Sequence, residues 1–137
     1  MSRAIQKFDV GLKAFIEQEG KILVVRESIG GKWEVPGGRI DVGEEGTDLK
    51  EILQREIHEE LGNACIVEIG APFYSWIRPW TPPKEGFVYL TGFRCFWKRG
   101  EITISEEHAE TRWIHKEEVD EIDWAPGYKE AARKYWL

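Results

Sequence analysis

The amino-acid sequence predicts one α/β domain, an α/β/α sandwich in which helices cover a mixed β-sheet. Its 137 residues suffice for one domain with its own hydrophobic core. Strand-like apolar runs stand on both sides of one long helical pattern, and a helical pattern ends the chain. This order favours a mixed sheet covered by helices. No repeat, low-complexity tract or linker divides the sequence, so we expect a single domain over residues 1–137.

The individual elements follow from the spacing of apolar residues and from the turn residues between them. Strands are expected at residues 8–16, 21–26, 32–35, 64–76, 87–97, 101–104 and 111–114. Apolar residues at a helical period indicate one long helix, which begins near Thr47 and Asp48, runs to about Leu61 and ends at Gly62 and Asn63. Two short helices are expected at residues 116–122 and 128–136.

The composition argues against several classes of partner. With 19 Lys and Arg against 25 Asp and Glu the net charge is −6, and no basic cluster offers the positive face of a duplex-binding protein. The apolar runs are far too short to span a bilayer, and residues 1–7 lack the apolar stretch of a secretory signal. Cys65 and Cys95 lie in apolar runs and are expected to be buried free thiols. We expect a cytoplasmic monomer or homodimer, with membranes and nucleic acids disfavoured as partners.

The long helix carries carboxylates on the side that should face the sheet. Its apolar stripe consists of Leu49, Ile52, Leu53, Ile57 and Leu61. Glu56 and Glu60 project into the middle of this stripe, and Glu59 lies at its edge. Buried carboxylates must pair or bind a cation, and clustered oxygen ligands suit a hard divalent ion such as Mg²⁺ or Mn²⁺. The alternative is that these are surface glutamates on a helix with a narrower apolar face.

The residues before and within this helix resemble the Nudix box, the signature of the Nudix hydrolase family. Gly38 and Glu44 have the spacing of its first half, and residues 55–62 (Arg-Glu-Ile-His-Glu-Glu-Leu-Gly) match its second half. Residues 33–38 look like the usual lead-in, and residues 107–113 are similar to a second, looser family element. The match over residues 38–63 departs from the signature twice. Ten residues instead of seven follow Glu44, an insertion of three, and Asn63 replaces an aliphatic residue.

The resemblance implies a loop-helix-loop that binds Mg²⁺, or Mn²⁺ in its place, on the diphosphate of a nucleoside diphosphate linked to another group. The implied metal ligands are Glu56, Glu59 and Glu60, joined by the backbone carbonyl of Gly37 or Gly38. Such a cation polarises phosphoryl oxygens and activates water.

The resemblance also assigns roles around the metal ligands. Arg55 would hold carboxylates in place by a bidentate contact, with Glu44 as its partner. The general base would be Glu56 or Glu107. For Glu107 the alternative is a solvated turn residue.

Contacts to the substrate are expected where a loop leaves the sheet. Trp76 and Trp80 flank Arg78, and an aromatic pair beside an arginine either stacks a base and binds a phosphate or packs the loop onto the domain. Arg26 and Lys84 are further candidate phosphate contacts, for which the alternative is solvated surface.

The activity expected is hydrolysis of a diphosphate (pyrophosphate) bond, with a nucleoside or deoxynucleoside triphosphate, or a dinucleoside polyphosphate, as the favoured substrate. One alternative is an ADP-ribose or nucleotide-sugar pyrophosphatase, for which the position of Pro79 is a weak indication. Others are a hydrolase of RNA 5′ ends and a non-catalytic nucleotide-binding module.

Overall fold

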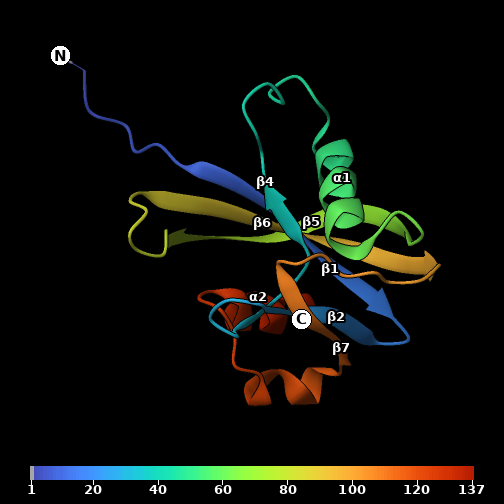
Figure 1. The fold of residues 1–137 in the computed structure, drawn as a ribbon. Helices are drawn as coiled ribbons and strands as arrows, with labels where there is room; N and C mark the ends of the chain where they lie inside the picture. Colours follow the sequence, from blue (N-terminus) through green and yellow to red (C-terminus); the bar gives the residue numbers. More distant parts are fainter. Residues whose placement is uncertain (1) are drawn as a thin grey trace.

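The computed structural model describes residues 2–137, which form a mixed sheet with helices on both sides (Figure 1). The strands are β1 (Asp9–Gln18), β2 (Lys21–Glu27), β3 (Trp33–Glu34), β4 (Gly37–Arg39), β5 (Ile66–Pro79), β6 (Phe87–Arg99) and β7 (His108–Ile114). The helices are α1 (Leu49–Leu61), the 3₁₀ helix η1 (Lys116–Glu121) and α2 (Tyr128–Tyr135). The predicted long helix is confirmed: Asp48 caps its start, and its last residue is Leu61.

Strand β1 organises the sheet, whose main order is β3-β2-β1-β6-β5, with β4 paired to β1 and β7 to β2. β1 and β6 run parallel, and the remaining pairs are antiparallel. One edge of β1 serves two partners, because β4 pairs with Gly11–Lys13 and β2 with Glu17 and Gln18. The predicted mixed sheet is thus confirmed. The glycines of β4 pair with Leu12 and Lys13 of β1, the strand in the middle of the sheet.

Two hydrophobic cores, one on each face of the sheet, complete the sandwich. Along β1, Leu12, Ala14 and Ile16 belong to the core beneath α1, and Phe15 belongs to the core that contains α2. Figure 1 shows α1 above the sheet and α2 below it. The apolar stripe of α1 is buried except at its first residue, because Leu49 is 48% exposed.

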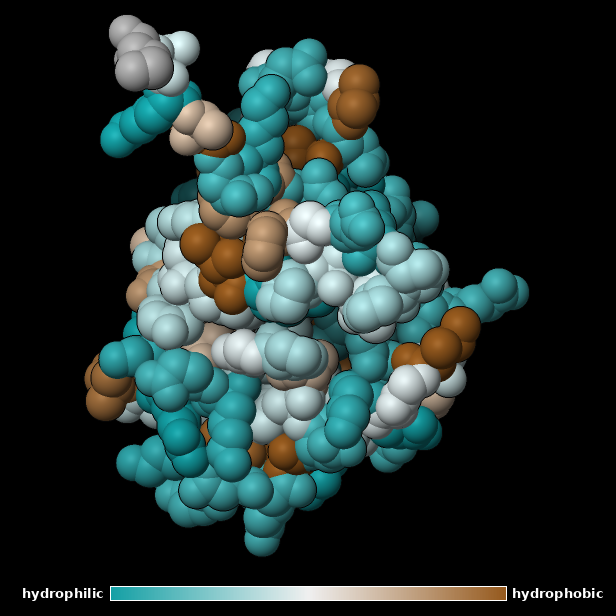
Figure 2. All heavy atoms as spheres, turned by 90° about the vertical axis from the view of Figure 1, so that its left-hand side faces the viewer, coloured by the Kyte–Doolittle hydropathy of each residue, from teal (hydrophilic) through white to brown (hydrophobic). Residues whose placement is uncertain are grey.

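Cys65 and Cys95 are both buried and free. Within residues 2–137 no helix has the length and apolar character needed to cross a membrane. The face shown in Figure 2 is mostly hydrophilic, and its apolar patches are small and separated by polar residues.

One predicted strand is wrong. Residues 101–104 do not join the sheet. The Thr103 and Ser105 N–H groups instead donate to the carbonyls of Leu61 and Glu60, at 2.8 and 3.1 Å. The last carbonyls of a helix lack partners within the helix, so this segment satisfies the end of α1 rather than a strand edge. The segment therefore anchors the end of the helix that carries the glutamates.

Candidate active site

One cleft, with a volume of about 1150 Å³, brings together residues from distant parts of the chain. Its lining comes from α1, β4, the loop after β2, the loop after β5, the turn before β7 and the start of α2. Concave sites that gather a few convergent polar groups are the usual location of ligand binding. The cleft is therefore the candidate active site.

Two of the three expected metal ligands line this cleft from the buried side of α1. Glu56 is 8% exposed and Glu60 is 7% exposed. The Gly37 N–H donates to Glu60 Oε1 at 2.9 Å, and a Cβ atom added at Gly38 would collide with the Glu56 carboxylate. Glycine at position 38 therefore lets the backbone of β4 lie directly against the Glu56 carboxylate, whereas a Cβ atom at Gly37 would collide with the Leu12 carbonyl of β1.

The guanidinium group of Arg55 contacts the carboxylates of Glu44, Glu56 and Glu59. Its Nε and Nη2 donate to Glu44 Oε2 and Oε1 at 3.0 and 2.8 Å, a bidentate contact. Nη2 also lies 3.0 Å from Glu56 Oε1, and Nη1 donates to Glu59 Oε1 at 3.0 Å. The geometry expected for Arg55 and Glu44 is present despite the insertion between them.

Glu59, the third expected ligand, lines the cleft with a side chain that is 58% exposed. Within residues 2–137, no three acidic, His or Cys side chains converge on a ready-formed metal site. Glu56 and Glu59 are bound to Arg55, and Glu60 is bound to Gly37. Rotation of these side chains is therefore needed before all three contact one ion.

The donor set fits a hard divalent cation. All the candidate donors are oxygens, which Mg²⁺ prefers. Burial raises the pKa of the Glu56 carboxyl, and burial raises the pKa of Glu60 to about 7. A bound cation favours the ionised form of such carboxyls and offsets the cost of burying them.

A buried charged cluster also lines the cleft, and it includes Lys13 and His108, neither of which was predicted from the sequence. Lys13 is 2% exposed, and its Nζ lies 3.1 Å from Glu34 Oε1. That oxygen also accepts from the Tyr128 hydroxyl at 3.3 Å, and Glu34 Oε2 lies 3.5 Å from His108 Nε2. The lone lysine within the apolar residues 12–16 was the signal that could have revealed this cluster.

The ionisation of Glu34 follows from its neighbours. Burial opposes it, but the charge of Lys13 and the hydrogen bonds from His108 and Lys13 outweigh burial and hold the pKa of Glu34 well below its usual value. Glu34 is thus a fixed negative charge on the cleft.

Three basic side chains surround Trp80 elsewhere on the cleft. Lys84 Nζ lies 3.8 Å from the centroid of the indole ring, and the guanidinium carbons of Arg39 and Arg78 lie 4.6 and 6.0 Å from it. The indole Nε1 donates to Asp9 Oδ2 at 2.7 Å. Trp80, Arg78 and Lys84 were expected near the substrate, whereas Arg39 was not singled out.

Two expected substrate contacts lie outside the cleft lining. Trp76 is 9% exposed and packs in the core, with its ring 5.2 Å from that of Tyr128. The structure therefore corrects the expectation that its indole could stack a base. Arg26 Nε donates to Glu110 Oε1 at 3.1 Å across β2 and β7, so its charge is already paired.

Glu107, expected as a proton acceptor, does line the cleft. The Ser28 N–H donates to the Glu107 carbonyl at 2.9 Å and ties this turn to the loop after β2. Within residues 2–137, the Glu107 carboxylate forms no side-chain hydrogen bond or ion pair.

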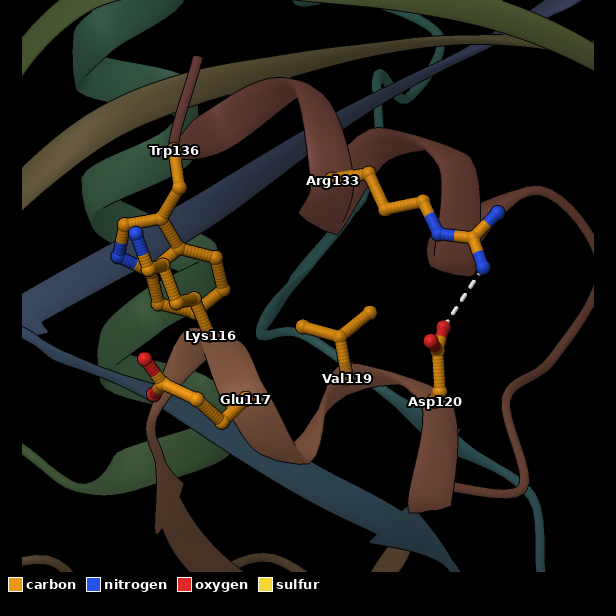
Figure 3. Close-up of a pocket in the computed structure, with 6 residues that line it drawn as sticks. All are labelled: Lys116, Glu117, Val119, Asp120, Arg133 and Trp136. Atoms are coloured by element: carbon orange, nitrogen blue, oxygen red, sulfur yellow. Dashed lines mark hydrogen bonds and ion pairs between the residues drawn. The ribbon is translucent and has the colours of Figure 1, made fainter.

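A second hollow of about 370 Å³ lies between η1 and the end of α2 (Figure 3). Val119 and Trp136 form its apolar part, and Arg133 donates to Asp120 Oδ1 at 2.6 Å across it (Figure 3). None of the α1 glutamates lines it. The hollow therefore has no connection to the proposed chemistry.

Comparison with known proteins identifies the family. The NUDIX domain model matches residues 7–135. The chain is 28% identical to the nucleoside triphosphatase NudI of Escherichia fergusonii, with 68% of each chain covered. Among solved structures, the MutT protein from Methanosarcina mazei Go1 is 25% identical with a TM-score of 0.78, covering 98% of this chain and 96% of that one. The Escherichia coli ORF135 protein shares the fold at 24% identity, with a TM-score of 0.77 and coverage of 96% and 90%. The chain therefore belongs to the Nudix hydrolase family of enzymes.

Proposed function

We propose that this enzyme cleaves a diphosphate bond in a nucleoside triphosphate or a dinucleoside polyphosphate, with Mg²⁺ bound at α1 and Mn²⁺ as a substitute. The observation that carries the proposal is the burial of Glu56 and Glu60 against Gly37 and Gly38 inside the cleft. A relative that is named a nucleoside triphosphatase supports the choice of substrate.

Glu56, Glu59 and Glu60, with the backbone carbonyl of Gly38, would hold the ion. When bound, Mg²⁺ neutralises phosphoryl oxygens and lowers the pKa of a coordinated water. Arg55 positions the acidic groups, because a planar guanidinium can bind several carboxylates at fixed angles and offset their mutual repulsion.

We assign the proton-accepting role to Glu107. Its carboxylate lines the cleft and is free of other polar side chains within the described part of the chain, so it is available to accept a proton from water. Glu56, the other candidate, is already engaged, because it lies 3.0 Å from the Arg55 guanidinium and is one of the proposed metal ligands.

The experiment is a substrate panel with product identification in the presence of Mg²⁺. The panel contains nucleoside triphosphates, dinucleoside polyphosphates, ADP-ribose, a nucleotide sugar and 5′-triphosphate RNA. We expect a nucleoside monophosphate and pyrophosphate from the triphosphates. Tight binding without any product would contradict the proposal and favour a non-catalytic binding module.

The matched variants are Glu60→Gln and Glu51→Gln, since Glu51 is exposed on the same helix and lies outside the cleft lining. Glu60→Gln should abolish turnover and weaken Mg²⁺ binding measured by calorimetry, whereas Glu51→Gln should retain both. Wild-type turnover in Glu60→Gln would remove Glu60 from the ligand set.

A further inference from the structure

We propose that Arg39, Arg78 and Lys84 form a phosphate site for the part of the polyphosphate chain that extends beyond the diphosphate bound at α1. This inference rests on the proposed function and narrows its substrate class. The site selects substrates with three or more phosphates over nucleoside diphosphates linked to a sugar.

The two arginines of this group have no carboxylate partner within residues 2–137, and Lys84 has a distant one. Within residues 2–137, neither Arg39 nor Arg78 forms an ion pair, and the buried Nε atom of each has no hydrogen-bond acceptor. Among the described residues, the carboxylate that pairs with Lys84 Nζ is that of Asp9, whose Oδ2 lies 3.9 Å away and already accepts from Trp80. Arg78 donates through Nη1 to the uncharged Pro79 carbonyl at 3.2 Å, so the charge of neither guanidinium is neutralised by a carboxylate within residues 2–137 and both can bind an anion.

The contrast with other basic residues strengthens this point. Several cations elsewhere on the domain lie within 3.1 Å of a carboxylate oxygen, namely Arg26, Lys32, Lys98, Arg112 and Arg133. In a chain with a net charge of −6, acidic partners are plentiful. Other cations without an ion pair in the described part of the chain, such as Lys50 and Arg99, are exposed and lie outside the cleft lining, whereas the three cations around Trp80 meet on one indole ring in the cleft.

Trp80 explains how these cations can lie close together without carboxylates. The face of an indole ring attracts ammonium and guanidinium groups but adds no negative charge. The ring is itself fixed through its Nε1 contact with Asp9. Trp80 thus holds the three cations together and leaves their positive charge available to a ligand. We infer this role for Trp80 in place of the predicted stacking on a base.

The position of the three cations relative to α1 determines which part of a substrate they can bind. Arg39 directly follows Gly38, whose backbone lies against the Glu56 carboxylate, and successive Cα atoms are about 3.8 Å apart. The cations line the same cleft as Glu56 and Glu60, so a polyphosphate chain bound at α1 can extend toward Arg39 within that cleft. A nucleoside diphosphate sugar has no third phosphate and leaves this group unneutralised.

The test combines kinetics with a binding measurement that does not depend on turnover. We compare the wild type with Arg78→Gln, Lys84→Gln and the double variant. The matched control is Arg99→Gln, an exposed residue at the end of β6 that lies outside the cleft lining. The readouts are the ratio of kcat/KM for a nucleoside triphosphate to that for ADP-ribose, and the calorimetric affinity for inorganic tripolyphosphate with Mg²⁺.

We expect each cleft substitution to lower both the kcat/KM ratio and the tripolyphosphate affinity by about tenfold, since each removes one hydrogen-bonded charge contact. Arg99→Gln should change neither. An unaltered ratio or an unaltered affinity in the double variant would overturn the phosphate site. A wild-type preference for ADP-ribose would also overturn it, yet would leave diphosphate hydrolysis intact. Absence of all hydrolysis would overturn the proposed function, and the tripolyphosphate affinities would then still decide the phosphate site.

Discussion

Replacing Lys13 by methionine tests whether the buried Lys13–Glu34 pair supports the folded cleft. The change removes the ammonium group and keeps a long flexible side chain. The Glu34 carboxylate, whose side chain is 19% exposed, then retains only Tyr128 and His108 as partners. Leaving one charge of a buried pair uncompensated costs about 3–5 kcal/mol.

This cost can be converted into a melting temperature. A chain of 137 residues has an unfolding entropy of about 0.29 kcal/mol/K near 60 °C. A loss of about 3–5 kcal/mol therefore lowers the melting temperature by about 10–17 °C. Thermal denaturation of the metal-free protein, followed by circular dichroism at one fixed pH, measures this shift directly.

The double variant Lys13→Met/Glu34→Gln separates the charge pair from simple loss of packing. Because it removes both charges, it should recover most of the stability that either single variant loses. Tyr128→Phe is the control for the smaller contact, since it deletes one hydroxyl and should cost about 1 kcal/mol. The reasoning is refuted if Lys13→Met melts within about 3 °C of the wild type, a shift of about 1 kcal/mol. It is also refuted if the losses of the two single variants simply add.

Three further predictions concern the α1 wall of the cleft. In the metal-free protein, stability should fall as the pH rises from about 4.5 to about 7. The folded chain binds a proton at Glu60 with a pKa of about 7, whereas the ordinary value is 4.5. Calorimetric scans at pH 5 and pH 7.5 should show a smaller fall for Glu60→Gln than for the wild type, and equal falls would contradict the burial of an ionisable group there. Glu107→Gln should lower kcat by about 10²–10⁴-fold at unchanged Mg²⁺ affinity, as expected for loss of a general base. A wild-type kcat in this variant would show that Glu107 is only a solvated turn residue. Arg55→Lys should weaken Mg²⁺ binding measured by calorimetry, because a point charge cannot replace the bidentate contact to Glu44, and an unaltered affinity would show that Arg55 does not position the ligands.

Local patterns predicted the parts of this fold that depend on neighbours in sequence. The limits of α1 followed from the apolar period, the Asp48 cap and the terminal Gly62. The burial of Glu56 and Glu60 followed from the same helical geometry. Each of these features is fixed within a few turns of one element, so a single sequence contains the necessary information.

The features that were not predicted depend on pairing between distant strands. Arg39 meets the loop that carries Lys84 because β1 pairs with both β4 and β6, through Gly11↔Arg39 and Asp9↔Val88. No local pattern specifies that register. The orientation of Trp76 was obscured in a different way. Bulges between Ile69 and Tyr74 interrupt the alternation of β5, so the face that Trp76 occupies cannot be counted from the start of the strand.

The insertion in the Nudix box is tolerated because it lies where added chain has little energetic effect. Residues 40–48 form the loop between β4 and α1, and lengthening such a loop from about six to nine residues costs about 0.4 kcal/mol of closure entropy. The loop is tied down on both sides of the added residues. Asp41 N–H donates to Glu44 Oε1 at 2.8 Å, and Asp48 Oδ1 accepts from Lys50 N–H at 2.8 Å as the cap of α1. With Glu44 and the helix start both fixed, the Arg55 contact depends on the ends of the loop and not on its length.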